Sequence, residues 1–125
     1  MADELKLRFG MTFSKGGVAP DLVPQVQSVD VTGTRYIRTV QTIGTSAEAL
    51  TLGDCASVGY ILVHNLDPTN FVQLGYDDTG FKDFITLLGG ASQTGDWAQF
   101  RCSQAAPQAK ADTDSCEIEI FIMET

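Results

Sequence analysis

Apolar and polar side chains alternate one by one at both ends of this 125-residue chain. Every second residue from Leu5 to Phe13 is apolar, and the same holds from Cys116 to Ile122. Successive side chains of a β-strand point to opposite faces, so a period of two predicts half-buried strands. We therefore expect both ends of the chain to be strands that are built into a sheet.

Short strand candidates separated by turn signals fill the middle of the chain. They are Gln25–Val31, Thr34–Ile43, Ala47–Leu52, Val58–Leu66, Phe71–Tyr76, Phe81–Leu88 and Trp97–Cys102. The breaks between them contain Pro, Gly, Asp and Asn, which favour turns for backbone reasons, and Thr32-Gly33 is a candidate hairpin turn. Strands of this length with a turn every 8–12 residues or so indicate an antiparallel β-sandwich of two sheets. We expect an all-β, jelly-roll-like sandwich of eight or nine strands.

Two segments lack a strand pattern. Residues 14–23 contain two glycines and a proline, which predicts a loop. Gln104–Asp112 is rich in alanine but is interrupted by Pro107, so we expect a loop with at most one helical turn. No internal repeat or low-complexity linker divides the chain, and its length suits one domain. The sequence therefore predicts a single β-sandwich domain over residues 1–125.

The net charge of −8 and the isoelectric point near 4.3 exclude several classes of partner. Nucleic acid and anionic membranes attract clusters of Lys and Arg, and the few basic residues here are spread out. The apolar runs are far too short to span a bilayer, and the first residues carry charges where a secretion signal needs an apolar core. We expect a soluble protein made in a cytoplasm, with no direct contact to nucleic acid or membrane.

Three cysteines and one histidine limit the chemistry that the chain can perform. The spacing of Cys55, Cys102 and Cys116 fits no disulfide framework or zinc motif, so we expect free and largely buried thiols. Cys102 and Cys116 lie in successive predicted strands, where they could face each other. His64 has no neighbouring ligand or nucleophile, and a metal site or a nucleophilic mechanism needs such partners. We expect a structural histidine that is hydrogen-bonded or lies at a sheet edge.

The acidic and aromatic residues give only weak signals for a site. Asp77–Gly80 lacks the longer ligand pattern of a calcium loop and predicts a hairpin turn. Glu117 and Glu119 share one face of a strand, as expected of a solvated or interface face. Motifs for a nucleophile or a phosphate loop are absent. We therefore expect no catalytic residue, metal ligand or cofactor. Two pairs of aromatic residues could form a platform that binds carbohydrate: Trp97 with Phe100, and Tyr60 with Phe71. In a β-protein such residues more commonly lie in the core, which is the expectation here.

The segment His64–Gly75 is rich in side chains that form hydrogen bonds. The carbonyl of Asn65, the carboxylate of Asp67 and the hydroxyl of Thr69 can each bond to nearby backbone groups and so fix a turn over Asp67–Asn70. Pro68 stiffens this turn and reduces the entropy that is lost on folding. We interpret the segment as a structural turn. Its residues are Asn65, Asp67, Pro68, Thr69 and Asn70.

The segment Gly59–Val72 resembles the small β-sandwich virion structural proteins of tailed bacteriophages. In those proteins a segment of the form Gly-Tyr-apolar-x-apolar-x-Asn-Leu-Asp-x-Thr-Asn-Phe-Val recurs. It is typically followed by an apolar-Gly pair, here Leu74-Gly75, and by a strand that ends in Leu and Gly, here at Leu87–Gly90. The resemblance covers roughly Gly53–Cys102, under half of the chain.

The resemblance implies a non-enzymatic subunit of the virion that is made in the host cytoplasm. Small size and acidic charge favour a capsid cement or decoration protein, which oligomerises and bridges and stabilises neighbouring major capsid proteins. The implied partners are the major capsid protein or other virion subunits, and further copies of the chain in a dimer or trimer. Contacts are expected at edge strands and at the two terminal segments, although the sequence does not identify the interface.

Two other classes of function stay open. One is a tail, baseplate or tail-fibre component, including a receptor-binding or carbohydrate-binding module. The other is a small cupin-type enzyme, which needs a histidine-rich metal set that a chain with one histidine almost rules out.

Overall fold

The computed structural model of the protein describes residues 5–12, 15–17 and 25–124. The described residues form ten β-strands and one short 3-10 turn, Ala91–Gln93, and contain no α-helix. The prediction of an all-β fold is therefore confirmed. The chain divides into two compact units, residues 1–32 and 33–125, and each is described by itself. A single domain over residues 1–125 stays a prediction.

The first unit contains a two-stranded antiparallel sheet of β1 (Leu5–Phe9) and β2 (Gln25–Val29). The two strands align so that Leu5 lies opposite Val29, and Phe9 lies opposite Gln25. The alternating N-terminal segment thus forms a strand, but its described part belongs to this small sheet and to neither sheet of the sandwich. Phe13 and most of the predicted loop at residues 14–23 lie outside the described residues.

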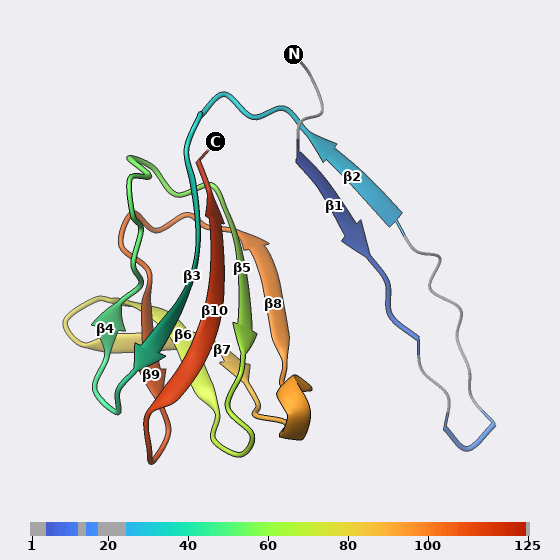
Figure 1. The fold of residues 1–125 in the computed structure, drawn as a ribbon, viewed down its shortest axis with the longest axis vertical. Coiled ribbons are helices and arrows are strands. Elements are labelled where there is room, and N and C mark those ends of the chain that lie inside the picture. Colours follow the sequence, from blue (N-terminus) through green and yellow to red (C-terminus); the bar gives the residue numbers. More distant parts are fainter. Residues whose placement is uncertain (1–4, 13–14, 18–24, 125) are drawn as a thin grey trace. The chain divides into compact units, whose positions relative to one another are not determined.

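The second unit is a sandwich of two four-stranded antiparallel sheets (Figure 1). The first sheet has the order β3 (Tyr36–Ile43), β10 (Cys116–Met123), β5 (Tyr60–Asn65), β8 (Trp97–Arg101). The second sheet has the order β4 (Glu48–Ala49), β9 (Gln108–Ala111), β6 (Val72–Asp77), β7 (Phe81–Leu87). Consecutive strands lie in opposite sheets except for β6 and β7, which form a local hairpin. This is the strand arrangement of a jelly roll, as the sequence predicts.

Strand β10 lies at the centre of the hydrophobic core. It pairs with β3 on one side and with β5 on the other, and its Ile118, Ile120 and Ile122 are completely buried. The alternate residues of the strand point away from the core, which explains the alternation of Ile with Glu in the sequence. The facing sheet contributes apolar residues of β6 and β9, including Val72 and Ala109. The prediction of a C-terminal strand within a sheet is confirmed.

The hairpin predicted at Thr32-Gly33 is wrong. Strand β2 pairs with β1, and β3 pairs with β10 over eight residue pairs, from Tyr36 opposite Met123 to Ile43 opposite Cys116. The long pairing with β10 places Ile43 in the core at zero exposure. Burial of apolar surface is the larger contribution to stability, about 25 cal/mol per Å², and it outweighs the local preference of a turn dipeptide.

The expectation of a loop over Gln104–Asp112 is confirmed for residues 104–107 and is wrong for residues 108–111. Residues Gln108–Ala111 form β9, an inner strand that pairs with both β4 and β6. Ala109 and Ala111 point inward and are almost completely buried. Alanine has a low strand propensity, but its small side chain fits a close approach of two sheets, so packing decides the conformation here. This strand brings the total to ten, where eight or nine were expected.

Candidate functional site

The turn Asp67–Asn70 is held by two side chains. Asp67 Oδ1 accepts hydrogen bonds from the backbone N–H groups of Thr69 at 2.8 Å and Asn70 at 2.6 Å. Asn65 Oδ1 accepts one from the N–H of Asp67 at 2.9 Å. The hydroxyl of Thr69 lies 3.4 Å from the same Asp67 oxygen and donates to this side chain. The donors of the turn are satisfied by the turn's own residues.

Asn65 joins this turn to the end of β7. The side chain is completely buried, and its Nδ2 donates to the carbonyl oxygens of Asn70 and Leu87, both at 2.9 Å. With the bond that its Oδ1 accepts, the amide makes three hydrogen bonds inside the protein. Burial of an amide is costly unless it is hydrogen-bonded, so the side chain fixes the position of both segments.

The glycines after β7 pack directly against the turn. A Cβ atom on Gly89 would lie 2.7 Å from the carbonyl oxygen of Asp67, and the N–H of Gly90 donates to that same oxygen at 2.9 Å. The Asp96 carboxylate accepts a bond from the N–H of Leu88 at 2.9 Å. We call Asn65, Asp67, Asn70, Gly89 and Asp96 the end cluster. Its hydrogen bonds join chain segments to one another, which is the geometry of a structural junction.

The end cluster also sets the protonation of two side chains. Burial opposes ionisation of Asp67, but hydrogen bonds from the N–H groups of Asn70 and Thr69 outweigh it and keep the pKa of Asp67 below its ordinary value. Burial, together with the negative charge of Asp67, raises the pKa of Cys116 to about 11. A thiol with this pKa is protonated at neutral pH and is a poor nucleophile.

His64 lies on an inner strand of its sheet, so the alternative of an edge histidine is wrong. Its ring stacks on Trp97 with centroids 3.8 Å apart and an angle of 7° between the planes. The side chain is only 5% exposed, and its Nε2 is buried with no hydrogen-bond partner among the described residues. The imidazole is therefore fixed by stacking, and the hydrogen bond expected for it is not found at Nε2.

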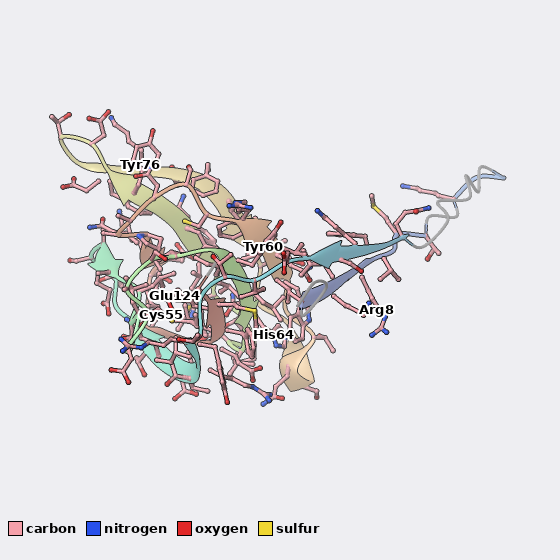
Figure 2. All side chains as sticks on the ribbon, turned by 90° about the horizontal axis from the view of Figure 1, so that it is seen from above. Arg8, Cys55, Tyr60, His64, Tyr76 and Glu124 are labelled. Atoms are coloured by element: carbon pink, nitrogen blue, oxygen red, sulfur yellow. The ribbon has the colours of Figure 1, made fainter. Side chains whose placement is uncertain are left out.

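All three cysteines lie within the described residues and are free. Cys55 and Cys116 are buried and Cys102 is half-buried, as the sequence predicts. Burial raises the pKa of the Cys55 thiol, and the negative charge of Glu124, which lies beside it (Figure 2), raises it further. Cys102 and Cys116 do not face each other: Cys102 Sγ lies 3.4 Å from the carbonyl oxygen of Gln104, and Cys116 Sγ lies 3.7 Å from that of Phe71.

The acidic residues form no metal site in the described part of the chain, where no group of three or more His, Cys, Asp or Glu side chains could hold an ion. Asp77 instead closes the β6–β7 hairpin, because its Oδ1 accepts a bond from the N–H of Gly80 at 3.0 Å. Among the same residues, no helix is long and apolar enough to cross a membrane.

The outer surface of the first sheet carries large apolar side chains. Strand register places twelve outward residues in three rows across β3, β10, β5 and β8. The rows are Tyr36–Met123–Tyr60–Arg101, Arg38–Phe121–Leu62–Gln99 and Val40–Glu119–His64–Trp97. We call these residues the aromatic face. The apolar side chains most exposed to solvent lie on its two edge strands: Tyr36 at 66%, Val40 at 53% and Trp97 at 56%. The apolar residues of the inner strands β10 and β5 are partly buried, and His64 is buried.

Contacts between neighbouring rows and strands order the side chains of the aromatic face. The Tyr36 and Phe121 rings stack with centroids 5.9 Å apart. Arg38 forms an ion pair with Glu119 at 3.2 Å, and the guanidinium of Arg101 lies over the Tyr60 ring, 5.8 Å from its centroid. Large side chains that are already ordered lose little entropy when a partner covers them, which favours binding.

The outer surface of the second sheet is different in character. Register places Gln73 opposite Thr86 and Lys110, and Gly75 opposite Gln108, on the side away from the core. These residues are polar or small, as usual for a solvated sheet face. Of the two sheets of the sandwich, the first thus carries the exposed aromatic and aliphatic side chains Tyr36, Val40 and Trp97 on its outer surface.

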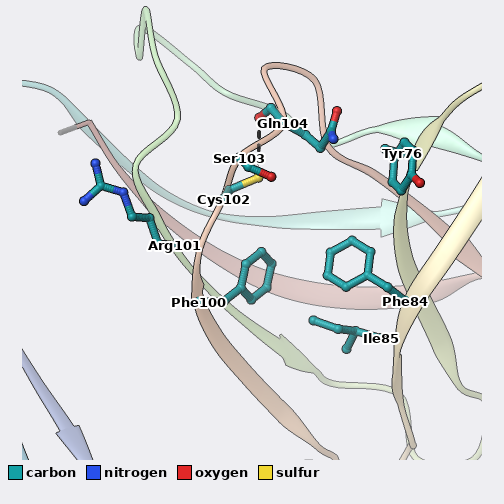
Figure 3. A pocket seen from close by; sticks show the side chains of 8 residues that line it. All are labelled: Tyr76, Phe84, Ile85, Phe100, Arg101, Cys102, Ser103 and Gln104. Atoms are coloured by element: carbon teal, nitrogen blue, oxygen red, sulfur yellow. Dashed lines mark hydrogen bonds between the residues drawn. The ribbon is translucent and has the colours of Figure 1, made fainter.

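A cavity of about 320 Å³ opens between the edge strands β7 and β8 (Figure 3). The rings of Phe84 and Phe100 pack edge to face there, with centroids 6.0 Å apart and an angle of 82° between the planes. Figure 3 shows the Arg101 side chain directed away from these rings, in agreement with its contact to Tyr60. The lining residues are Tyr76, Phe84, Ile85, Phe100, Arg101, Cys102, Ser103 and Gln104.

Neither aromatic pair that the sequence suggests forms a platform. Trp97 points outward on β8, whereas Phe100 packs against the core on the other side of the same strand. Tyr60 lies on β5 of the first sheet, and Phe71 directly precedes β6 of the second. Both surfaces described above combine residues from strands far apart in the sequence. In the sequence, the signal for the aromatic face was the alternation within each single strand, which shows the residues that share the outward side of that strand.

No family model matches the chain, and no curated protein or solved structure matches it either. The function is therefore argued from the residues and from the geometry of these surfaces.

Proposed function

We propose that the protein is a non-enzymatic structural subunit of a bacteriophage virion, acting as a capsid cement or decoration protein that bridges and stabilises neighbouring capsid subunits. The observation that carries the assembly role is the aromatic face. Exposed apolar side chains grouped on one side of a small β-sandwich mark a protein–protein interaction surface. The viral setting is supported by the sequence resemblance of Gly59–Val72.

The distribution of chemical groups supports binding over catalysis. The end cluster uses Asp67 and Asn65 to join segments of the chain. The buried Cys116 is protonated at neutral pH because its pKa is about 11. His64 stacks on Trp97. These polar groups thus stabilise a rigid framework, which suits a subunit that must stay folded while it reinforces a shell.

A comparison of particles that carry or lack the protein tests this proposal. A cement protein binds the assembled shell and not the dissociated subunits, so it stabilises the shell by mass action. We expect the heads of particles without the protein to break open at a lower temperature and under milder chelation than the heads of particles with it, as seen by cryo-electron microscopy. Adding the purified protein back should restore the stability. Particles that keep heat-stable heads but lose tails or host adsorption would contradict the cement role.

The cavity between β7 and β8 favours a second candidate function, a receptor-binding or carbohydrate-binding module of the tail. Its volume of about 320 Å³ lies in the range of small-ligand sites, and three aromatic rings line it. A titration with host-surface glycans, followed by NMR, tests this candidate. Phe84→Ala should abolish the chemical-shift changes, whereas Leu88→Ala, at an exposed position that does not line the cavity, should preserve them. Glycans that shift no resonance would eliminate this function.

A further inference from the structure

We propose that two copies of the chain pair with each other through the aromatic face, so that the cement subunit is a two-fold dimer. The inference rests on the proposed function, because it names the partner that covers the surface on which that function is argued. In such a pairing the same residues lie on both sides of the interface.

The size of the first sheet suits a weak dimer. Its strands hold 8, 8, 6 and 5 residues, and at about 3.3 Å per residue and 4.8 Å between strands they give a flat area of roughly 430 Å² on each copy. Two copies would then bury about 860 Å², and more where side chains stand out of the sheet, which is in the range of a weak interface. Tyr36 and Trp97, the most exposed rings of this face, are of the type that contributes most to binding energy.

Charge favours a second copy over an unrelated partner. The chain carries −8, but the aromatic face contains two arginines, Arg38 and Arg101, and one glutamate, Glu119, and the next outward residue of β10 is Glu117. The outer side of the first sheet thus carries as many arginines as glutamates. Two acidic molecules repel each other least when they approach through their least acidic surfaces. Because this face carries both signs of charge, it is also complementary to itself. A basic partner, in contrast, would be attracted to the acidic remainder of the surface.

The pairing gives the bridging role a physical basis. In such a dimer the first sheet of one copy covers the first sheet of the other. Every other surface is then presented twice, including the polar outer surface of the second sheet with Gln73 and Thr86. Two identical binding surfaces can hold two neighbouring capsid subunits at once, and the second contact is then intramolecular.

Sedimentation of the purified full-length chain over a series of concentrations tests the dimer. Trp97 is the only tryptophan of the chain and lies on the aromatic face, so its fluorescence reports directly on burial. We expect a monomer–dimer equilibrium and a blue shift of the emission as the concentration rises. The dimer should tighten in high salt, because salt screens the remaining repulsion between acidic chains.

Val40→Lys is the decisive variant. The exposed Val40 lies opposite Glu119, so a lysine is tolerated in the monomer but places a charge within the proposed interface. We expect the dimer affinity to fall about tenfold or more. Thr86→Lys makes the same change of charge on the outer surface of the second sheet and should leave the affinity unchanged. Tyr36→Ser should weaken the dimer by a similar factor if Val40→Lys fails to fold.

A chain that sediments as a monomer at every concentration would overturn the dimer, as would equal affinities for Val40→Lys and Thr86→Lys. Both results are obtained in solution without particles. Failure of the cement function is instead measured on particles, so the two proposals can fail separately.

Discussion

Asn65 is the side chain on which the end cluster most depends. It is completely buried, and its three hydrogen bonds reach the turn after β5 and the end of β7. A buried amide with every bond made within the chain holds both segments in one arrangement, because any other arrangement leaves polar groups unpaired.

Replacing Asn65 by Ala leaves the carbonyl oxygens of Asn70 and Leu87 and the N–H of Asp67 without this partner. We expect the free energy of unfolding to fall by about 3 kcal/mol, measured by urea denaturation. Asn70→Ala is the matched control, since its side chain accepts only an exposed bond from Thr113 at 3.3 Å. This variant should lose under about 1 kcal/mol. Equal losses in the two variants would contradict the role of Asn65.

The carboxylate of Asp67 makes the stability of the fold depend on pH. Its pKa in the folded state lies below the ordinary value of 3.8, so the unfolded chain binds this proton more tightly. The stabilisation from Asp67 is therefore fully present above pH 3.8 and is lost as the pH falls through the lower folded-state pKa.

Asp67→Asn should remove this part of the acid sensitivity. Its side-chain oxygen can still accept the bonds from Thr69 and Asn70, but it does not titrate. We expect a flatter dependence of the unfolding free energy on pH below about 4 than in the unchanged protein. Urea denaturation at a series of pH values measures both slopes, and identical slopes would show that Asp67 is not the group responsible.

The hairpin of β6 and β7 contains an irregularity that shapes the edge of the second sheet. The register shifts between Leu74 and Gly75, so that Leu74 lies opposite Ile85 but Gly75 lies opposite Asp83. Phe84 is the extra residue of this bulge, and its ring lines the cavity beside Phe100. Bulges commonly redirect a side chain near the end of a sheet, and this one turns a phenyl ring toward the gap between the sheets.

Gly75 is required by the bulge. A Cβ atom at this position would collide with the carbonyl oxygen of Lys82 and lie 2.7 Å from its carbonyl carbon. Gly75→Ala should therefore lower the free energy of unfolding by about 2–3 kcal/mol. Gly44→Ala is the control, because its Cβ would meet only Glu48 Oε2 at 3.4 Å. Thermal denaturation that ranks the two variants equally would contradict this account.

The hydrophobic core of the molecule belongs to the second unit. The core cluster and the residues packed against it extend from Ile37 to Ile122. The first unit contributes a two-stranded sheet, and an isolated pair of strands is marginally stable in water. Stability of the whole chain is thus determined mainly by residues 33–125.

A chain that begins at Gly33 should fold without the first unit. We expect its far-UV circular dichroism to remain that of a β-protein and its urea unfolding to remain cooperative, because the core is retained in full. A truncated chain with a broad, non-cooperative transition would instead favour the prediction of one domain over residues 1–125.

Local pattern was enough to locate most strands and the turn. The alternation of Ile118, Ile120 and Ile122 with polar residues identified β10, and Asp67 and Pro68 identified the turn that follows β5. The pattern failed at Ala109 and Ala111, because alanine is too small to produce a clear apolar face. It also failed to reveal the cavity, which depends on a register shift that no local signal records.

By itself, the sequence determined that most of the chain folds as a jelly-roll-like sandwich, because one-by-one alternation and closely spaced turns allow few other folds. Only the tertiary structure decided which strands pair: β3 with β10, and β1 with β2. Pairing between distant strands follows from the burial of the whole core and not from neighbouring residues. The same long-range order gathers Tyr36, Phe121 and Trp97 onto one surface, and the aromatic face exists because of it.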